Sequence, residues 1–436
     1  MSRFAIVGAA ALLLAGPAFG QSGQEIAANA VDTGDTAFVL LCAALVMLMT
    51  PGLAFFYGGM VRGKNVLATL MQSFVALAIV GVQWVLWGYT LAFGPDIGGF
   101  IGGLGFLGLS NVGLEPNADY AATIPHQTFM IYQCMFAIIT PALITGAIAE
   151  RMRFKTFLVF MVLWATLVYD PIAHWVWAVG GYLRGMGALD FAGGTVVHIS
   201  SGVSALVAAI VLGRRRGFPD TPMPPHNLPF TLLGAGLLWF GWFGFNAGSA
   251  LSAGGLATGA FVATNTAAAA ATLAWILMDW FVKGKPTALG AASGAVAGLV
   301  AITPAAGFVS PLAALAIGAL GGMVCFGVVS YRARTGIDDS LDVFGVHGIG
   351  GTVGALLTGV FASTAVNSGG GDGLLHGNPS LLGVQALAVL ITWVYSALVT
   401  FVILKVLDVV MGLRVSSEAE EGGLDVDQHR ESAYAT

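Results

Sequence analysis

The residues best suited to chemistry are two histidines, His198 and His347, which lie inside apolar stretches long enough to cross a membrane. The other five histidines fall at the ends of such stretches, in connections or in the C-terminal tail. A polar group within a bilayer is costly and by default marks a function. Two imidazoles in contact can share one proton, because one ring donates a hydrogen bond and the other accepts it. The pair therefore predicts a proton relay or a hydrogen-bonding site for a small polar molecule.

Carboxylates precede both histidines, Asp190 in DFAGGTVVH and Asp342 in DVFGVHG. Each is placed to accept backbone N–H bonds at a helix start, so simple capping is the alternative to a functional role. A third acid, Asp170 in LVYDPIAHW, falls within an apolar stretch, and its role is left open. A metal would need a third ligand, and no Cys, Glu or further His stands at matching depth. No metal or cofactor is therefore expected.

Aromatic residues are the second feature. Tyr132 and Phe136 share a helical face at i and i+4, Trp177 ends the triplet WVW, and Phe245 precedes Ser249 by one turn in WFGFNAGSA. Most aromatics in membrane proteins belong to interface belts or packing. Ring faces also attract cations, however, and a hydroxyl can accept a hydrogen bond from one. An aromatic cage near an outer mouth predicts a site for a small cation.

The composition indicates which elements must position these residues. Of 436 residues, 57% are hydrophobic and 9% are charged, whereas about 25% are charged in a typical soluble domain. This composition excludes an ordinary cytosolic enzyme, and the net charge of −5 provides no basic patch for nucleic acid. The chain is expected to be an all-α polytopic protein of the lipid bilayer.

Eleven apolar stretches are predicted to span the membrane. They lie at about 36–59, 66–93, 126–149, 156–179, 195–213, 228–248, 256–282, 287–303, 308–331, 343–365 and 381–412. A basic residue, a short apolar core and the small-x-small triplet AFG predict a secretory signal peptide before them. The expected organisation is a signal peptide at 1–20, a transmembrane domain at 21–412 and a cytoplasmic tail at 413–436.

The basic residues predict the orientation. Twelve lysines and arginines fall in the odd-numbered connections between spans, and only Arg184 falls in an even-numbered one. This asymmetry places the odd connections and the tail in the cytoplasm and the N-terminus outside. Eleven spans divide into five, five and one, and a second unit of five must enter from the opposite side. The arrangement is typical of an inverted repeat, with its site at the repeat interface, and His198 and His347 take equivalent positions in the two units.

Several strings, in order, resemble the ammonium transporter (Amt/Mep/Rh) superfamily, in particular its bacterial AmtB-like members. They are PGLAFFYGGMVRGKN, FAIITPALITGAIAERMRF, ALDFAGGTVVHI, PHNLPF, WFGFNAGSA, DVFGVHG and GGLDVDQHRESAYA. The resemblance implies a homotrimer in the bacterial inner membrane that takes up ammonium, with one hydrophobic pore through each protomer and no enzymatic activity.

The same resemblance implies an outer substrate-binding site, a pore gate below it, twin histidines lining the pore, and a supporting carboxylate. The outer site would comprise Phe136, Trp177, Ser249 and Thr303. The gate would comprise Phe136, Phe245 and Tyr132. His198 and His347 would be the twin histidines, and Asp190 the supporting carboxylate. Ammonium would lose its proton, neutral ammonia would cross, and the proton would follow the histidine pair. Potassium and sodium cannot be deprotonated, so a dry pore would exclude them.

The C-terminal tail carries six acidic and two basic residues. Its composition favours a solvated end, whereas the resemblance implies gating and binding of a PII-type signalling protein. The alternative function is an ammonium sensor that signals through a docked cytoplasmic partner. An intramembrane metalloenzyme that uses the histidine pair is a further alternative, and the lack of a third metal ligand argues against it. An Rh-like channel for neutral gas is a closer alternative, but the outer WVW and FNAGS strings favour recruitment of a cation.

Overall fold

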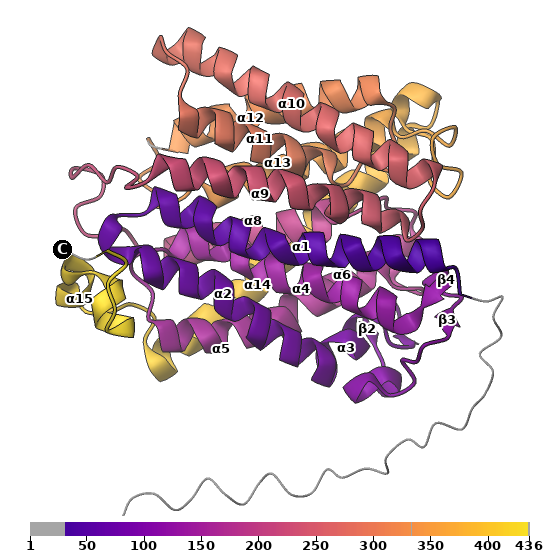
Figure 1. The fold of residues 1–436 in the computed structure, drawn as a ribbon, viewed down its shortest axis with the longest axis horizontal. Helices are drawn as coiled ribbons and strands as arrows, with labels where there is room; N and C mark the ends of the chain where they lie inside the picture. The colour runs from indigo at the N-terminus through magenta and orange to yellow at the C-terminus, as the bar shows by residue number, and fades with distance from the viewer. Residues whose placement is uncertain (1–30, 333, 435–436) are drawn as a thin grey trace, which may run out of the picture.

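Long apolar helices run roughly side by side along the longest axis of the molecule (Figure 1). The computed structural model describes residues 31–332 and 334–434, so the expected signal peptide at 1–20 lies outside the described residues. The tail helix α15 (Ser417–Gly422) lies at one end of the bundle, and the short strands lie at the other (Figure 1). The α15 end corresponds to the expected inner face, because Lys64 and Arg216 of two basic connections bond to the tail there.

The fourteen helices that precede α15 make up the bundle. They are α1 (Thr33–Met60), α2 (Val66–Gln83), α3 (Tyr89–Phe93), α4 (His126–Ile148), α5 (Phe154–Trp164), α6 (Asp170–Trp177), α7 (Tyr182–Gly185), α8 (Ser200–Leu212), α9 (Leu228–Ala247), α10 (Gly255–Lys283), α11 (Ala288–Ile302), α12 (Pro311–Arg332), α13 (Ile349–Phe361) and α14 (Pro379–Met411). Two antiparallel pairs occupy the outer end: β1 (Asp96–Ile97) with β2 (Ile101–Gly102), and β3 (Pro116–Asn117) with β4 (Ala121–Pro125).

Ten helical segments of the described residues are long and apolar enough to cross a membrane, and their positions match ten of the expected spans. The remaining expected span, at 287–303, corresponds to α11, an apolar helix of 15 residues. A straight crossing needs about 20 residues. The chain is therefore a multi-pass membrane protein, and α11 is the segment whose length departs from the expectation.

Four of these segments contain a π-helical turn, a feature that sequence patterns did not predict. The turns are η2 (Trp84–Gly88), η4 (Ala165–Tyr169), η5 (Gly194–Ile199) and η7 (Phe344–Gly348). Such turns are rare and frequently mark functional sites. The two histidines that the sequence singled out both lie in them, His198 in η5 and His347 in η7.

Glycines allow the two histidine-bearing segments to approach at backbone contact. A Cβ added at Gly202 of α8 would lie 2.1 Å from the backbone nitrogen of Gly348. A Cβ added at Gly351 would lie 2.8 Å from the carbonyl oxygen of Gly194. Small residues let membrane helices pack closely, and here this packing brings η5 and η7 together at the centre of the bundle.

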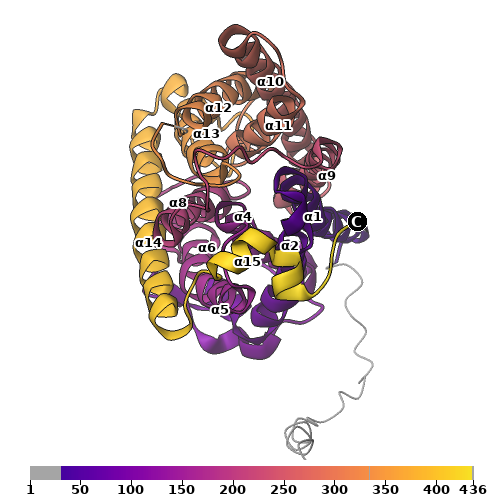
Figure 2. The same cartoon turned by 90° about the vertical axis from the view of Figure 1, so that its left-hand side faces the viewer.

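The helices form two groups when viewed from the inner end (Figure 2). The earlier helices, drawn in indigo to magenta, make one group, and α10 to α13 make the other (Figure 2). Helix α1 packs along α9 where the groups meet, and α14 runs along one edge, where it contacts α5, α8 and α13. The last helix therefore braces segments from both groups.

The tail folds back across the inner end, where α15 lies over the ends of the bundle helices (Figure 2). Asp425, in the π-helical turn η9 (Asp425–His429), accepts the backbone N–H groups of Leu67 and Ala68 at the start of α2. The backbone N–H of Leu424 donates to Asn65 Oδ1 at 2.8 Å. These bonds satisfy donors that a helix start leaves free, so the tail is a docked segment and not a solvated end.

Candidate functional site

An aromatic cavity opens at the outer end of the bundle, with a volume of about 160 Å³. Phe136 of α4, Trp177 of α6 and Ser249 after α9 line it. The rings of Phe136 and Trp177 meet at 87° with centroids 5.8 Å apart. Aromatic faces and one hydroxyl thus surround the same small space, which suits a small cation that can also donate hydrogen bonds.

Hydrogen bonds fix the polar groups of this cavity. Trp177 Nε1 donates to the backbone carbonyl of Asp190 at 2.9 Å. Ser249 Oγ donates to the carbonyl of Phe245 at 2.9 Å, so its lone pairs stay free to accept. The Tyr132 hydroxyl lies 3.2 Å from Ser249 Oγ and 2.8 Å from the Phe245 carbonyl oxygen. The cavity therefore offers an acceptor that is already oriented.

Two phenylalanine rings close the floor of the cavity. The centroids of Phe136 and Phe245 lie 4.3 Å apart, at an interplanar angle of 38°. Tyr132 packs against Phe136 from one turn away, with centroids 5.0 Å apart. All three side chains are buried. Any molecule that leaves the outer cavity toward the bundle centre must displace these rings.

The two histidines contact each other below the rings. Nδ1 of His198 and Nδ1 of His347 are 3.2 Å apart, and the ring planes differ by 25°. One ring must donate and the other accept, so a single proton joins them. Nε2 of His198 is buried without a hydrogen-bond partner among the described residues. That ring lines the central cavity, so the atom is free to contact a molecule held there.

Small cavities continue the path on both sides of the histidines. The central one, of about 10 Å³, is lined by Phe245, His198, His347 and apolar side chains. The inner one, of about 40 Å³, is lined by His347 and by Tyr57 and other residues near the inner end. A space needs about 10–15 Å³ to hold one water molecule, so the central segment has room for one water molecule at most.

Asp190 acts as a cap for the turn that carries His198. Its carboxylate accepts the backbone N–H groups of Gly193, Gly194, Thr195 and Val196 at 2.6 to 3.2 Å, and the Thr195 hydroxyl as well. The capping alternative thus describes its geometry. Because its carbonyl also holds Trp177, Asp190 connects the outer cavity to the first histidine segment.

Asp342 does not cap η7, which corrects the capping alternative for this acid. The carboxylate that accepts the N–H of Phe344 belongs to Asp339, at 2.8 Å. Asp342 instead has a φ of 60° and pairs with Arg332 at 2.5 Å. Burial raises the pKa of Asp342 to about 6, although the charge of Arg332 acts in the opposite direction. Asp342 lines the inner cavity together with His347.

Thr303 is not among the residues that line the outer cavity. It is fully buried, and its hydroxyl accepts from Trp242 Nε1 at 2.8 Å. The indole of Trp242 stacks on His198, with centroids 5.3 Å apart. Trp242 lines the central cavity with His198, and no sequence pattern singled it out, although it lies in the same aromatic string as Phe245.

Asp170 lies within the fourth span, fully buried. Its carboxylate accepts from Gln83 Nε2 at 2.8 Å, and its other oxygen has no partner among the described residues. Gln83 adjoins η2 and Asp170 adjoins η4, so the bond joins two π-helical turns. Asp170 lines none of the three cavities along this path.

The sequence of this chain is similar to those of known ammonium transporters. The sequence model of a family described as the Ammonium Transporter Family matches residues 37–434. The ammonium transporter of Bacillus subtilis is 58% identical over 405 residues, which are 93% of this chain and 99% of that protein. The ammonium transporter Amt1 of Archaeoglobus fulgidus is 50% identical over 404 residues, which are 93% and 100% of the two chains.

Two solved structures extend the similarity to the fold. The crystal structure of Mep2 from Saccharomyces cerevisiae superposes with a TM-score of 0.84 at 38% identity, covering 89% of each chain. A structure described as a sensor Amt protein superposes with a TM-score of 0.84 at 30% identity, covering 91% of this chain and 98% of the other.

Proposed function

This chain belongs to the ammonium transporter family, and from that membership we propose that it takes up ammonium across the inner membrane of a bacterial cell. One observation carries the mechanism: an aromatic cavity, a pair of closed rings and two contacting histidines follow one another through the bundle. The protein is a transporter and not an enzyme, and no cofactor takes part.

Recruitment of ammonium takes place in the outer cavity. The faces of Phe136 and Trp177 attract the cation, and Ser249 Oγ accepts one of its N–H groups. Asp190 keeps Trp177 oriented through the bond from the indole to its carbonyl. Thr303 contributes through Trp242, whose indole it holds, and not by contact with the cation.

Passage beyond the cavity separates ammonium into ammonia and a proton. The Phe136–Phe245 gate, supported by Tyr132, closes the path to a solvated ion, and the narrow segment below it cannot replace the hydration of a charge. Ammonia crosses as the neutral molecule. The proton passes through the His198–His347 pair, because Nδ1 of one ring can take a proton as the other ring releases its own.

This separation gives selectivity and a net movement of charge. Each cycle carries one ammonia molecule and one proton inward, so one positive charge crosses and uptake responds to membrane potential. Potassium and sodium have no proton to lose and stay outside. The proposal therefore differs from a channel for neutral gas, which would carry no current.

The test is to reconstitute the full chain in liposomes and to record currents on a solid-supported membrane. Ammonium pulses are expected to evoke a saturable inward current, and potassium pulses of the same size are expected to evoke none. The absence of an ammonium current, with ammonia flux still present, would favour the gas channel. Equal currents for ammonium and potassium would contradict the proposed selectivity.

We propose the following architecture for the transporter. Eleven spans form a 5+5 inverted repeat plus a C-terminal helix, with the N-terminus outside and the tail in the cytoplasm. The occurrence of both histidines in π-helical turns of the fifth and tenth spans supports the repeat, since equivalent positions then carry equivalent backbone features. Three protomers assemble into a homotrimer, which a native mass measurement in detergent would test.

A PII-type signalling protein is the proposed partner at the inner face. The docked tail supports this role, because it lies across the inner ends of the helices and offers acidic side chains there. When nitrogen is plentiful, the partner would close the inner mouth. A pull-down without PII association under any nucleotide or 2-oxoglutarate condition would remove this part of the proposal.

The second candidate function is an ammonium sensor that signals through a docked cytoplasmic partner. The structural likeness to a sensor Amt protein favours it. A sensor would bind ammonium without supporting a saturable current. The recordings described above therefore distinguish the two functions directly.

A further inference from the structure

Arg184 occupies an unexpected place at the outer end of the bundle. It alone, among the lysines and arginines in connections between the expected spans, falls on the outer side. Its exposed side chain extends from α7, and Nη1 donates to the backbone carbonyl of Trp177. Arg184 also lines the aromatic cavity, where the proposed substrate is itself a cation. A positive charge at this position repels the cation that the aromatic rings of the cavity would attract.

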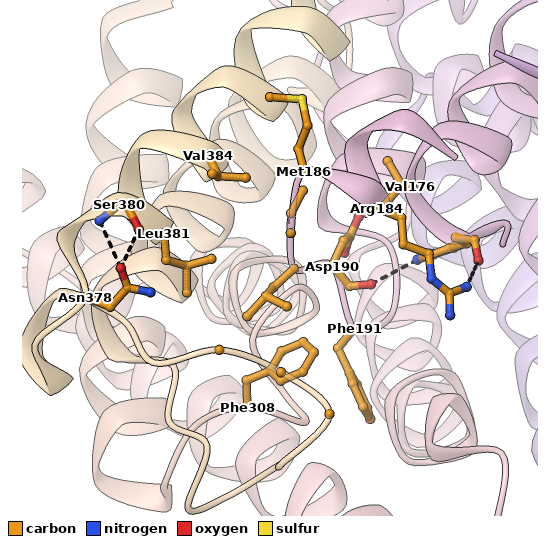
Figure 3. A pocket seen from close by; sticks show the side chains of 17 residues that line it. Val176, Arg184, Met186, Asp190, Phe191, Phe308, Asn378, Ser380, Leu381 and Val384 are labelled. Carbon is orange, nitrogen blue, oxygen red and sulfur yellow. Dashed lines mark hydrogen bonds between the residues drawn. The ribbon is translucent and has the colours of Figure 1, made fainter. Parts of the chain in front are cut away.

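A larger cavity of about 550 Å³ adjoins the aromatic one. Trp177, Arg184 and Phe191 line both cavities, so they form the wall between them. Figure 3 shows Arg184 beside Val176 and Asp190 on one side of the larger cavity, across from Leu381 and Val384. A cation in either cavity therefore lies near the Arg184 side chain.

Acidic groups near this wall differ in their capacity to offset Arg184. The Asp96 carboxylate bonds to His174 at 2.9 Å. The Asp190 carboxylate is buried and receives hydrogen bonds from the backbone of η5. Asp119, in the loop between β3 and β4, lines the aromatic cavity and is exposed. Asp119 is thus the acid placed to attract the cation that Arg184 repels.

The charges of both residues reach the cavity wall at Tyr120, which lines the same space. Burial raises the pKa of Tyr120 to about 12, the charge of Arg184 acts in the opposite direction, and the charges of Asp119 and Asp96 act in the same direction as burial. The hydroxyl therefore responds to both signs of charge. A cation held among the rings experiences the same two fields.

We infer that Arg184 and Asp119 act as an opposed pair that sets the affinity for ammonium at the outer mouth. Arg184 raises the ammonium concentration needed for half-saturation, and Asp119 lowers it. Charges at the rim of a site act mainly on capture and on its salt dependence. This inference rests on the proposed function, since it takes ammonium as the substrate of the aromatic cavity.

A structural role for Arg184 makes the opposite prediction. If its main effect were to hold Trp177 through the carbonyl bond, its removal would loosen the aromatic cavity and weaken capture. That weakening would persist at high salt, because it does not arise from charge. The sign of the change and its salt dependence therefore separate the two roles.

The experiment measures the half-saturating ammonium concentration of the current at low and high sodium chloride, with the full chain in liposomes. At low salt, R184Q is expected to lower this concentration by about threefold and D119N to raise it by a similar factor, as expected for rim charges within one Debye length. At about 1 M salt, where the Debye length is about 3 Å, the half-saturating concentrations of both variants should approach the wild-type value. R184K keeps the charge and should match the wild type.

The control is K155Q, which removes one exposed positive charge from the inner end of α5. It should leave the half-saturating concentration for ammonium added outside unchanged. A half-saturating ammonium concentration of R184Q at low salt that equals or exceeds the wild-type value would overturn the inference. If R184Q does not assemble, a D119N protein without an increase overturns it equally. A wild-type protein without ammonium current would instead contradict the proposed function, so the two failures are distinguishable.

Discussion

His198 and His347 face each other through the same ring atom, Nδ1, at 3.2 Å. A hydrogen bond between two Nδ1 atoms needs a proton on one and a lone pair on the other, so the two rings occupy different tautomers. Moving one proton along the pair exchanges these roles. Stacking against Trp242 and Phe245 holds the His198 ring in place. The proposed relay thus combines the fixed geometry of the two rings with movement of one proton between them.

Removal of both rings tests this mechanism at the residue scale. The double variant H198A/H347A is expected to lose most of the ammonium-selective current, because the proton no longer has a path through the apolar segment. The measurement is current on a solid-supported membrane together with ammonia flux. A matched control is H376A, since His376 is exposed in the outer loop before α14. A double variant with full, ammonium-selective current would refute the relay.

Thr303 allows a finer test, because contact with substrate and support of Trp242 predict different kinetics. T303V keeps the shape of the side chain but removes the acceptor of Trp242 Nε1. Leaving that buried N–H unpaired should cost about 1–3 kcal/mol of stability, seen as a lower melting temperature. If Thr303 acts through Trp242, the maximal current falls while half-saturation stays constant. A rise in half-saturation at unchanged maximal current would assign Thr303 to the outer binding site instead.

At the scale of elements, the contact between α8 and η7 decides whether the histidines meet. The backbones cross at Gly202 and Gly348 so closely that no space remains for a methyl group on Gly202. Glycine has no side chain, so at such a crossing it lets the two helices approach closely. Because His198 and His347 lie within four residues of these glycines, a small separation of the segments moves both rings.

G202A is therefore expected to abolish or strongly reduce transport. The new Cβ would lie 2.1 Å from the Gly348 nitrogen, and backbone cannot yield as a flexible side chain can. Overpacking of this kind typically costs about 1–3 kcal/mol, measurable by thermal unfolding in detergent. The matched control is G236A in α9, where an added Cβ meets open space. It should leave both transport and stability close to the wild-type values, and an equal loss in both variants would contradict the crossing argument.

Sequence patterns could locate the spans and the histidines, but not the details of helix phase and turn geometry. His198 and His347 stand out because almost everything around them is apolar. Trp242 does not stand out, since α9 is apolar on all sides and its neighbours Phe240 and Phe243 are aromatic too. In the structure, Phe240 is exposed and Phe243 stacks on Phe261, away from the histidines.

The carboxylates before η7 illustrate the same limit. Asp339 and Asp342 both precede the turn in DDSLDVFGVHG, and spacing alone cannot choose the cap. Asp342 has a left-handed φ of 60° and pairs with Arg332, whereas Asp339 accepts the N–H of Phe344. Two identical residues in one short string therefore take different roles.

At the scale of the whole molecule, charged side chains join the inner connections into one network. Glu150 accepts from Arg62 and from Arg215, and Arg215 in turn pairs with Asp338 at 2.8 Å. Arg216, beside Arg215, donates its backbone N–H to Glu420 of the tail. Connections from distant parts of the sequence are thus held in register with the tail, so a change at the tail can reach the inner ends of several spans.

Glu150 gives this network a defined pH dependence. Burial alone would raise the pKa of Glu150, but the bonds and charges of Arg62 and Arg215 outweigh burial, and the pKa lies below its ordinary value of 4.5. A carboxyl group whose pKa is lowered in the folded protein stabilises the fold at pH values above the ordinary pKa of the group. That stability is lost as the pH falls through the lowered pKa. The melting temperature should therefore be constant near neutral pH and fall below about pH 4.5.

E150Q should remove this dependence. At pH 7 the variant is expected to be less stable by about 3–5 kcal/mol, because the buried Arg215 loses a charged partner. The difference from the wild type should shrink as the pH falls below 4.5, where the Glu150 carboxyl takes up a proton first in the unfolded chain and then, below its lowered pKa, in the folded protein. The matched control is E421Q, since Glu421 pairs with Arg216 at an exposed site where an ion pair contributes little. Equal melting temperatures of E150Q and the wild type at every pH would show that the charge of Glu150 does not stabilise the protein, and the Arg215–Asp338 pair would then hold these connections without it.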